Sequence, residues 1–266
     1  MLVRKVADLD LPELEPYRTL RRPLEHARKG IFVAEGDKVV RRLLESSLEL
    51  VSVLLTPQWY QKLLADNRYF IHEVFVAEKE LLETIVGYPL HQGVMAVAKI
   101  PEERSWPDAF TTLTGPMLLV ALDGIVNAEN VGIIVRNCAA FGVHAIFVGK
   151  TSSSPYLRRA VRNSMGSVFR IPIFHSANLA ETLSQLRQGW NVKIIATTPH
   201  ENITIHDVDL TGNVCFVFGN EGAGISEPVL TVCTHRAAIP MRNQTDSINV
   251  STAAAVFLYE FRRRVL

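Results

Sequence analysis

The stretch IPMRNQTDSINVSTAAAVFLYEF, residues 239–261, decides the expected fold of the C-terminal half. An apolar strand end at 237–241 leads into a polar loop without an alternating pattern, and the loop enters a long apolar helix. Ser247 and Asn249 are residue types that cap helix N-termini, and the alanines at 253–255 leave one face of the helix open to close approach. Because the free N–H groups of a helix N-terminus point into the preceding loop, we expect a ligand there.

Two earlier stretches follow the same plan. VCFVFGNEGAGIS at 214–226 is an apolar strand followed by a glycine-rich loop, with Ser226 as the expected N-cap and Pro228 just inside the next helix. MLLVALDGIVNAENVGIIVRNCAAFG at 117–142 is a strand, a loop and a helix that is expected to start near Asn130. In an open parallel sheet such turns gather at the carboxyl edge, so the three loops are expected to meet.

Composition indicates a globular chain but does not identify its partner. The chain of 266 residues, 48% hydrophobic and 21% charged, is long enough for one large domain or two small ones, and two are favoured. The 28 Lys and Arg nearly balance the 27 Asp and Glu. Local runs are more informative, because 150–180 contains five basic residues and no acid, and basic residues also dominate 18–42. Such runs are typical of phosphate binding, with solvated helix faces as the alternative interpretation.

Cysteine and histidine usage predicts a reduced compartment and no metal site. The three cysteines lie in apolar stretches without CxxC spacing, and the eight histidines lack metal-ligand spacing. The N-terminus has no signal-peptide core, and no apolar run reaches about 18 residues. We therefore expect a cytoplasmic protein without membrane spans or metal.

The order of elements predicts two α/β domains. Residues 1–22 are expected to form a helix and an arm, and strands and helices then alternate up to residue 100 in a small α/β sandwich. This first domain, 1–105, contains no cluster of acid, base and nucleophile, so it is interpreted as a binding module. A linker is expected at 106–116. The second domain, 117–266, is expected to hold a largely parallel, doubly wound sheet. Its expected strands are 117–123, 144–149, 168–174, 192–197, 214–219 and 236–241.

The three loop segments, in this order, resemble the motifs of the SpoU, or TrmH, branch of the SPOUT RNA methyltransferases. The resembling residues are Asn130-x-Gly132 with Arg136 and Phe141-Gly142, then Phe218-Gly219-Asn220-Glu221-Gly222-x-Gly224-Ile225, then Ile239-Pro240-Met241 through Ser247-Ile248-Asn249-Val250-Ser251. The resemblance covers 117–266 closely. The first 100 residues are more loosely similar to the ribosomal-protein-like RNA-binding domain that often precedes this catalytic domain.

The resemblance implies a C-terminal trefoil knot that binds S-adenosylmethionine. No pattern in the residues themselves predicts a knot, since threaded chains are rare. Carried over from the family motifs, the expected cofactor-binding residues are Thr197, Thr198, Phe218, Gly219, Asn220, Gly224, Ile239, Met241 and Ile248.

The resemblance also implies a catalytic set centred on Arg136. The matching arginine of the family is proposed to act on a ribose 2'-hydroxyl as a general base; because arginine stays protonated, holding a phosphate and polarising the hydroxyl is the alternative. Glu221 would orient Arg136 or accept a hydrogen bond from the ligand, and Asn130 would stabilise the first loop or contact the substrate. Ser247 and Asn249 would position the ribose or only cap the helix.

The function expected from the resemblance is a homodimeric ribose 2'-O-methyltransferase acting on structured rRNA or tRNA. The expected RNA-binding residues are Arg21, Arg22, Arg28, Arg158, Arg159 and Arg162. A dinucleotide-dependent oxidoreductase is a weaker alternative, because GNEGAG lacks the GxGxxG register and no ribose-binding acid follows the next strand. An RNA-binding protein without catalysis is another alternative, against which the presence of Arg136, Glu221 and Asn249 argues.

Overall fold

The computed structural model describes residues 2–8, 10–64, 69, 71–86, 93–102, 105–111, 115–199, 201–243 and 245–265. The chain forms two compact units. The first comprises Met1–Glu102 with Tyr156–Phe169, and the second Glu103–Pro155 with Arg170–Leu266. Segment 156–169 was expected in the second domain, but it packs with the first unit.

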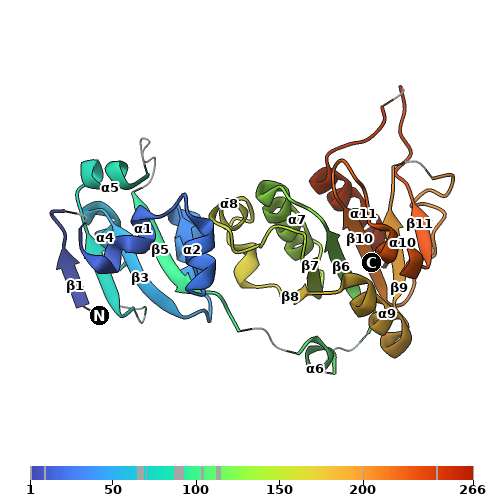
Figure 1. Ribbon diagram of the computed structural model, residues 1–266, viewed down its shortest axis with the longest axis horizontal. Coiled ribbons are helices and arrows are strands. Elements are labelled where there is room, and N and C mark those ends of the chain that lie inside the picture. The colour runs from blue at the N-terminus through green and yellow to red at the C-terminus, as the bar shows by residue number, and fades with distance from the viewer. Residues whose placement is uncertain are drawn as a thin grey trace. The chain divides into compact units, whose positions relative to one another are not determined.

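The first unit contains a five-stranded mixed sheet in the order β1-β4-β3-β5-β2. The pairs β1/β4 and β3/β4 are parallel, and β3/β5 and β2/β5 are antiparallel. Figure 1 shows β3 and β5 side by side in this sheet. The expectation of a helix at the N-terminus was wrong for residues 2–5, since these residues pair with β4 as a parallel edge strand. The strands are β1 Leu2–Lys5, β2 Ile31–Glu35, β3 Leu50–Leu55, β4 Glu73–Val76 and β5 Val94–Lys99.

Helices of the first unit bury apolar side chains against this sheet. Leu14, Tyr17 and Leu82 pack in one core cluster with strand residues such as Phe75 and Met95. Strand–helix alternation therefore predicted this α/β layer arrangement. The helical segments are η1 Pro12–Leu14, α1 Glu15–Arg18, α2 Pro23–Arg28, α3 Asp37–Leu44, α4 Pro57–Leu63 and α5 Lys79–Val86.

Segment 156–169, with α8 (Arg158–Asn163) and η2 (Ser167–Phe169), packs on the edge strand β2. The ring of Phe32 lies 5.5 Å from Tyr156 and 5.6 Å from Phe169. Arg158 Nη1 donates to Glu35 Oε2 at 2.6 Å, and Arg42 Nη1 donates to the carbonyl oxygen of Met165. Aromatic contacts and charge pairing thus bind the segment to the first unit.

The second unit holds a six-stranded sheet in the order β11-β9-β10-β6-β7-β8, and all its pairs are parallel. The predicted parallel sheet is therefore confirmed. Two strands differ from their predicted ranges: β8 starts only at 173, after the short helix η2, and β11 is shorter than 236–241. The strands are β6 Leu118–Asp123, β7 Ala145–Gly149, β8 Ile173–Ser176, β9 Lys193–Thr197, β10 Val214–Gly219 and β11 His235–Ala237.

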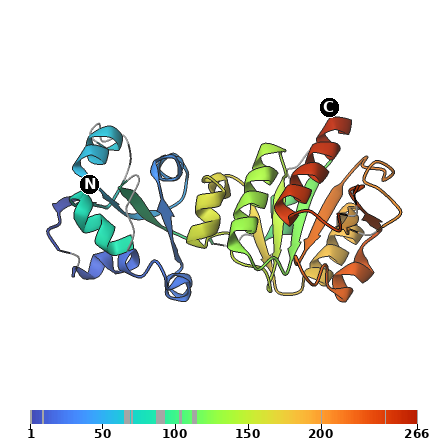
Figure 2. The ribbon, with the colours of Figure 1, turned by 90° about the horizontal axis from the view of Figure 1, so that it is seen from above.

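Helices cover both faces of this sheet. Figure 2 shows α7 (Ala128–Ala140) and α11 (Val250–Val265) on one face, with α9 (Leu179–Trp190) and α10 (Glu227–Val232) on the other. The alternation of β10 explains this arrangement, because Cys215 and Val217 join the core on the α9 side while Phe216 and Phe218 meet Phe257 of α11. Both faces of β10 are therefore buried, as expected for a central parallel strand.

The stretch expected to be a linker contains the helix α6 (Trp106–Phe110). Its aromatic rings pack on Phe147 and Trp190, so α6 belongs to the core of the second unit. Residues 112–114 of the expected linker lie outside the described residues. None of the described helices is long and apolar enough to cross a membrane.

Candidate functional site

Three loops lie at the carboxyl edge of the second sheet, after β6, β10 and β11. Strands β6 and β10 are neighbours whose last pair is Asp123 and Gly219. Asn220 Nδ2 donates to the carbonyl oxygen of Gly124 at 2.8 Å, and the backbone N–H of Ser226 donates to Asp123 Oδ2 at 2.7 Å. The first and second loops are therefore held together by hydrogen bonds.

The loop after β10 is a tight turn closed on itself. The N–H groups of Asn220 and Gly224 donate to each other's carbonyl oxygens at 2.9 Å. Asn220 Oδ1 also accepts from the N–H groups of Gly222 and Ala223 at 2.9 Å. A Cβ atom on Gly219 would lie 2.5 Å from the backbone of Gly224, so the close approach requires glycine at 219.

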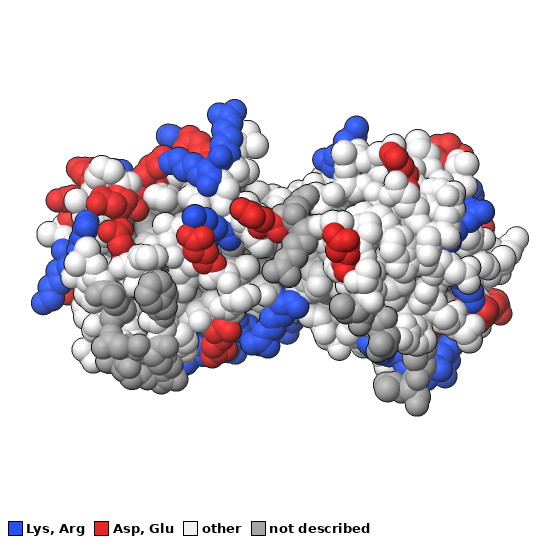
Figure 3. All heavy atoms as spheres, turned by 90° about the horizontal axis from the view of Figure 1, so that it is seen from below, with Lys and Arg blue, Asp and Glu red and all other residues white. Residues whose placement is uncertain are grey.

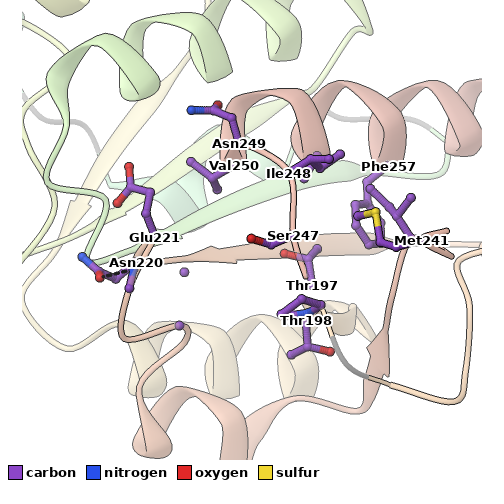
Figure 4. A pocket seen from close by; sticks show the side chains of 16 residues that line it. Thr197, Thr198, Asn220, Glu221, Met241, Ser247, Ile248, Asn249, Val250 and Phe257 are labelled. Atoms are coloured by element: carbon purple, nitrogen blue, oxygen red, sulfur yellow. Dashed lines mark hydrogen bonds between the residues drawn. The ribbon is translucent and has the colours of Figure 1, made fainter. Parts of the chain in front are cut away.

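A cavity of about 360 Å³ opens beside this turn. Figure 4 shows Met241 and Phe257 at one end, and Glu221 and Asn249 at the other. One end can therefore take an apolar group, and the other can accept hydrogen bonds. The lining residues are Thr197, Thr198, Pro199, Gly219, Asn220, Glu221, Gly222, Gly224, Ile239, Met241, Ser247, Ile248, Asn249, Val250, Ala253 and Phe257.

Two threonines at the end of β9 have different roles in the cavity wall. Thr197 Oγ1 donates to the carbonyl oxygen of Val217 at 2.8 Å, which ties β9 to β10. Thr198 Oγ1 is buried and has no hydrogen-bond partner in the described part of the chain. Because leaving a buried hydroxyl unpaired is costly, this atom indicates a polar ligand group in the cavity.

A cluster of amides and one carboxylate joins all three loops. Asn130 of α7 donates through Nδ2 to Glu221 Oε1 at 2.6 Å. Asn249, directly before α11, donates through Nδ2 to Asn130 Oδ1 at 3.1 Å. Three predicted catalytic residues are thus in direct contact, although they are far apart in the sequence.

Arg136 lies outside this cluster. It is exposed on α7, and it does not line the cavity. Among the described residues it makes no hydrogen bond or ion pair, and Glu221 is bonded to Asn130 instead. Within a single chain, the contact expected between Arg136 and Glu221 is not formed.

Most predicted cofactor residues line the cavity, with one exception. Phe218 is fully buried behind the wall, with its ring 6.0 Å from Phe257. The predicted site residues did not include Pro199, Gly222 or the wall of α11, formed by Val250, Ala253 and Phe257. The spacing of these three residues, i, i+3 and i+7, marks one helix face and could have revealed them.

The helix starts differ slightly from prediction. Helix α7 was expected to start near Asn130 and starts at Ala128, and its N-cap is Asn127, whose Oδ1 accepts from the N–H of Glu129 at 2.8 Å. Asn249 caps α11, whereas Ser247 lies two residues earlier in the exposed loop. Ser226 holds the N-cap position of α10, as predicted.

The predicted RNA-binding arginines fall into two groups. Arg22, which is exposed, pairs with Glu25, and the partly buried Arg158 pairs with Glu35; Arg21, Arg28, Arg159 and Arg162 are exposed and form no ion pair among the described residues. On the face in Figure 3, basic and acidic side chains are interspersed on each unit. Within the described residues, no group of three or more His, Cys, Asp or Glu side chains could hold a metal ion.

Known proteins match both the sequence and the fold. An uncharacterised tRNA/rRNA methyltransferase of Mycobacterium tuberculosis (strain ATCC 25618 / H37Rv) is 32% identical over 270 residues, covering 98% of this chain and 92% of the relative. The 23S rRNA (guanosine-2'-O-)-methyltransferase RlmB of Acinetobacter baylyi is 32% identical over 240 residues, covering 87% of this chain and 96% of RlmB.

Solved structures of methyltransferases share the fold of this chain. The SpoU methyltransferase AviRb from Streptomyces viridochromogenes has a TM-score of 0.81 at 25% identity, covering 94% of this chain and 96% of AviRb. An AdoMet-bound rRNA methyltransferase from Sinorhizobium meliloti, with a TM-score of 0.86, 24% identity and 99% coverage of both chains, shares the fold. The SpoU rRNA methylase family is matched over residues 117–259. The chain therefore belongs to the SpoU rRNA methylase family of RNA methyltransferases.

Proposed function

We propose that this chain transfers a methyl group from S-adenosylmethionine to a ribose 2'-hydroxyl of structured rRNA or tRNA. The observation that carries the proposal is the cavity, whose apolar end faces a carboxylate and amide cluster built from three loops. Its volume of about 360 Å³ lies within the range of small-molecule sites. RlmB, a relative named as a guanosine-2'-O-methyltransferase, and the AdoMet-bound structure named above support the reaction and the donor.

The residues of the cavity fit this donor. Gly219, Ile239 and Ile248 would offer backbone groups to the adenine, and Met241 and Phe257 would provide apolar contacts. The unpaired hydroxyl of Thr198 would gain a partner on binding. When bound, S-adenosylmethionine supplies an electrophilic methyl group.

The acceptor side needs a positioned hydroxyl and control of its proton. A ribose 2'-hydroxyl is a weak acid, so orientation and charge stabilisation would provide much of the rate. We propose that Arg136 holds a phosphate and polarises the hydroxyl, because a guanidinium stays protonated. Glu221, with Asn130 and Asn249, would position the reacting ribose or the donor. Ser247 would contact the ribose from the loop before α11.

We propose that the active form is a homodimer in which Arg136 serves the cavity of the other copy. Two observations support this arrangement: Arg136 does not line its own cavity, and α11 carries the exposed apolar residues Val256 and Tyr259, which are 36% and 57% exposed. The ring of Tyr259 lies 6.4 Å from Phe141, at the C-terminus of the helix that carries Arg136. A second copy would cover this surface.

We also propose that the two units have different roles, RNA binding and catalysis. The first unit, including segment 156–169, would bind RNA through the exposed Arg21, Arg28, Arg159 and Arg162. The second unit would carry catalysis, with the trefoil knot implied by the family motifs around 239–261. The free thiols of Cys138, Cys215 and Cys233 fit a cytoplasmic protein.

Mixing two inactive variants tests the reaction and the shared site together. Arg136→Ala and Glu221→Gln are each expected to lower methyl transfer to RNA at least about 100-fold. If the sites are shared, mixed dimers contain one intact site and recover activity towards one quarter to one half of the wild-type rate. Activity of Arg136→Ala equal to wild type would refute the assignment of that residue. Absence of donor binding by calorimetry would favour an RNA-binding protein without catalysis.

A further inference from the structure

A residue outside the predicted catalytic set anchors the amide and carboxylate cluster. Ser251, in the first turn of α11, is buried and only 5% exposed. Its backbone N–H donates to Asn249 Oδ1 at 2.8 Å, and its hydroxyl donates to the same oxygen at 2.6 Å. Both donors of Ser251 thus converge on one amide oxygen.

This anchor fixes the direction of every hydrogen bond that follows. A backbone N–H can only donate, so the Asn249 atom that faces it must be the carbonyl oxygen. Asn249 then presents its NH₂ group to Asn130 Oδ1, and Asn130 presents its NH₂ group to Glu221. The carboxylate of Glu221, at the far end, can only accept a hydrogen bond when it is ionised. The donors of Ser251 and the carboxylate of Glu221 therefore each require the amide orientations of Asn249 and Asn130 described above.

The anchor is itself held by the helix that carries Asn130. Asn137 Nδ2 donates to the carbonyl oxygen of Ser251 at 2.8 Å. Asn130 and Asn137 lie seven residues apart on α7, and therefore on the same helix face. Helix α7 consequently contacts Ser251 at the start of this hydrogen-bonded chain, through Asn137, and Glu221 at its end, through Asn130.

We propose that Ser251 is a positioning residue that acts through Asn249 and Asn130 to orient the carboxylate of Glu221. The proposal deepens the proposed function and rests on it for the catalytic readout. With Oε1 engaged by Asn130 at 2.6 Å, the other carboxylate oxygen is left to accept a hydrogen bond from a group bound in the cavity. Ser251 itself does not line the cavity.

Side-chain amide signals in NMR spectra of the ligand-free protein test the orientation step without any assay of activity. Ser251→Ala keeps the backbone N–H donor, so the Asn249 amide is expected to keep its orientation, but it removes the hydroxyl donor that holds the amide in place and is expected to shift the NH₂ signals of both Asn249 and Asn130. Ser251→Cys keeps the packing with a much weaker donor and is expected to give the same pattern if Ser251→Ala does not fold. Unchanged Asn130 signals in a folded variant would overturn the proposal.

Kinetics test the functional step. Ser251→Ala is expected to lower kcat about fivefold while the Kd of S-adenosylmethionine stays within about twofold of wild type, and Ser251→Thr, which restores the hydroxyl, is expected to recover most of the loss. Thr252→Ala, at the adjacent exposed position of the same helix turn, is the matched control and is expected to change neither value. Equal loss in Ser251→Thr and Ser251→Ala would show that the hydroxyl is not the active group.

A double-mutant cycle separates this proposal from the proposed function. If Ser251 acts through Glu221, adding Ser251→Ala to Glu221→Gln costs no further activity in single-turnover reactions. Additive losses would overturn the proposal even though methyl transfer is real. If wild-type protein transferred no methyl group, the proposed function would fail, while the NMR experiment would still decide the orientation step.

Discussion

Replacing Gly219 with alanine tests the geometry of the cavity wall. A Cβ atom at this position would lie 2.5 Å from Gly224 C and Ile225 N and 2.6 Å from Gly224 O. All three atoms belong to the backbone, so no side-chain rotation can relieve the overlap. The turn from Asn220 to Gly224 would have to open, and its two mutual backbone hydrogen bonds at 2.9 Å would be strained.

Overpacking is expected to lower the free energy of unfolding by about 1–3 kcal/mol. Each backbone hydrogen bond that is lost would lower it by about 1 kcal/mol more. A loss near 3 kcal/mol corresponds to a decrease in melting temperature of roughly 6–12 °C for a chain of this size. Because the same turn lines the cavity, the Kd of S-adenosylmethionine is expected to rise at least about tenfold, which corresponds to roughly 1.4 kcal/mol.

Calorimetry of the folded variant measures the Kd, and thermal unfolding measures the stability. Gly222→Ala is the matched control in the same turn, because its nearest contact would be Asn220 Oδ1 at an ordinary 3.6 Å. We expect its melting temperature to stay within about 2 °C of wild type. A Gly219→Ala protein with wild-type stability and donor affinity would refute the reasoning about the turn.

Further predictions concern charges outside the cavity. Hydrogen bonding to Arg263 lowers the pKa of Glu260, whose side chain is 6% exposed, to about 2. The ionised carboxylate therefore stabilises the folded state above pH 5, and this contribution is lost as the pH falls towards 2. Glu260→Gln should accordingly lower the melting temperature at pH 7 but have little effect near pH 2. Arg158→Ala should destabilise the first unit by about 1–3 kcal/mol in urea unfolding, because the 2.6 Å ion pair with Glu35, whose side chain is only 10% exposed, is removed. The neighbouring Arg159→Ala should leave stability unchanged and instead reduce the salt dependence of RNA binding by about one unit of slope in filter-binding titrations.

Local sequence patterns predicted the sheet of the second unit because its strands are continuous apolar runs. They failed at β1, since Leu2–Lys5 is short, charged and 41–51% exposed at Leu2 and Val3, so that only pairing with β4 makes it a strand. They also failed for segment 156–169, which lies between the two stretches of the second unit in sequence but packs on Phe32 of the first unit through contacts distant in the chain.

The cavity was largely predictable because the family motifs mark its loops. That Phe257 of α11 lines the cavity was not predicted, because this residue was interpreted only as part of an apolar helix. The hydrogen-bonded chain from Ser251 to Glu221 could not be predicted, because amide orientation depends on atoms brought together by folding. Arg136 remains a prediction, since a single chain holds it away from the cavity.

The central claim is tested most directly by incubating the protein with methyl-labelled S-adenosylmethionine and rRNA or tRNA from cells that lack the gene, followed by digestion to nucleosides and mass spectrometry. We predict label in one 2'-O-methylnucleoside, and at least about 100-fold less label when Glu221→Gln protein is used. Label on a base, or no transfer by a wild-type protein that binds both the donor and RNA, would contradict the account.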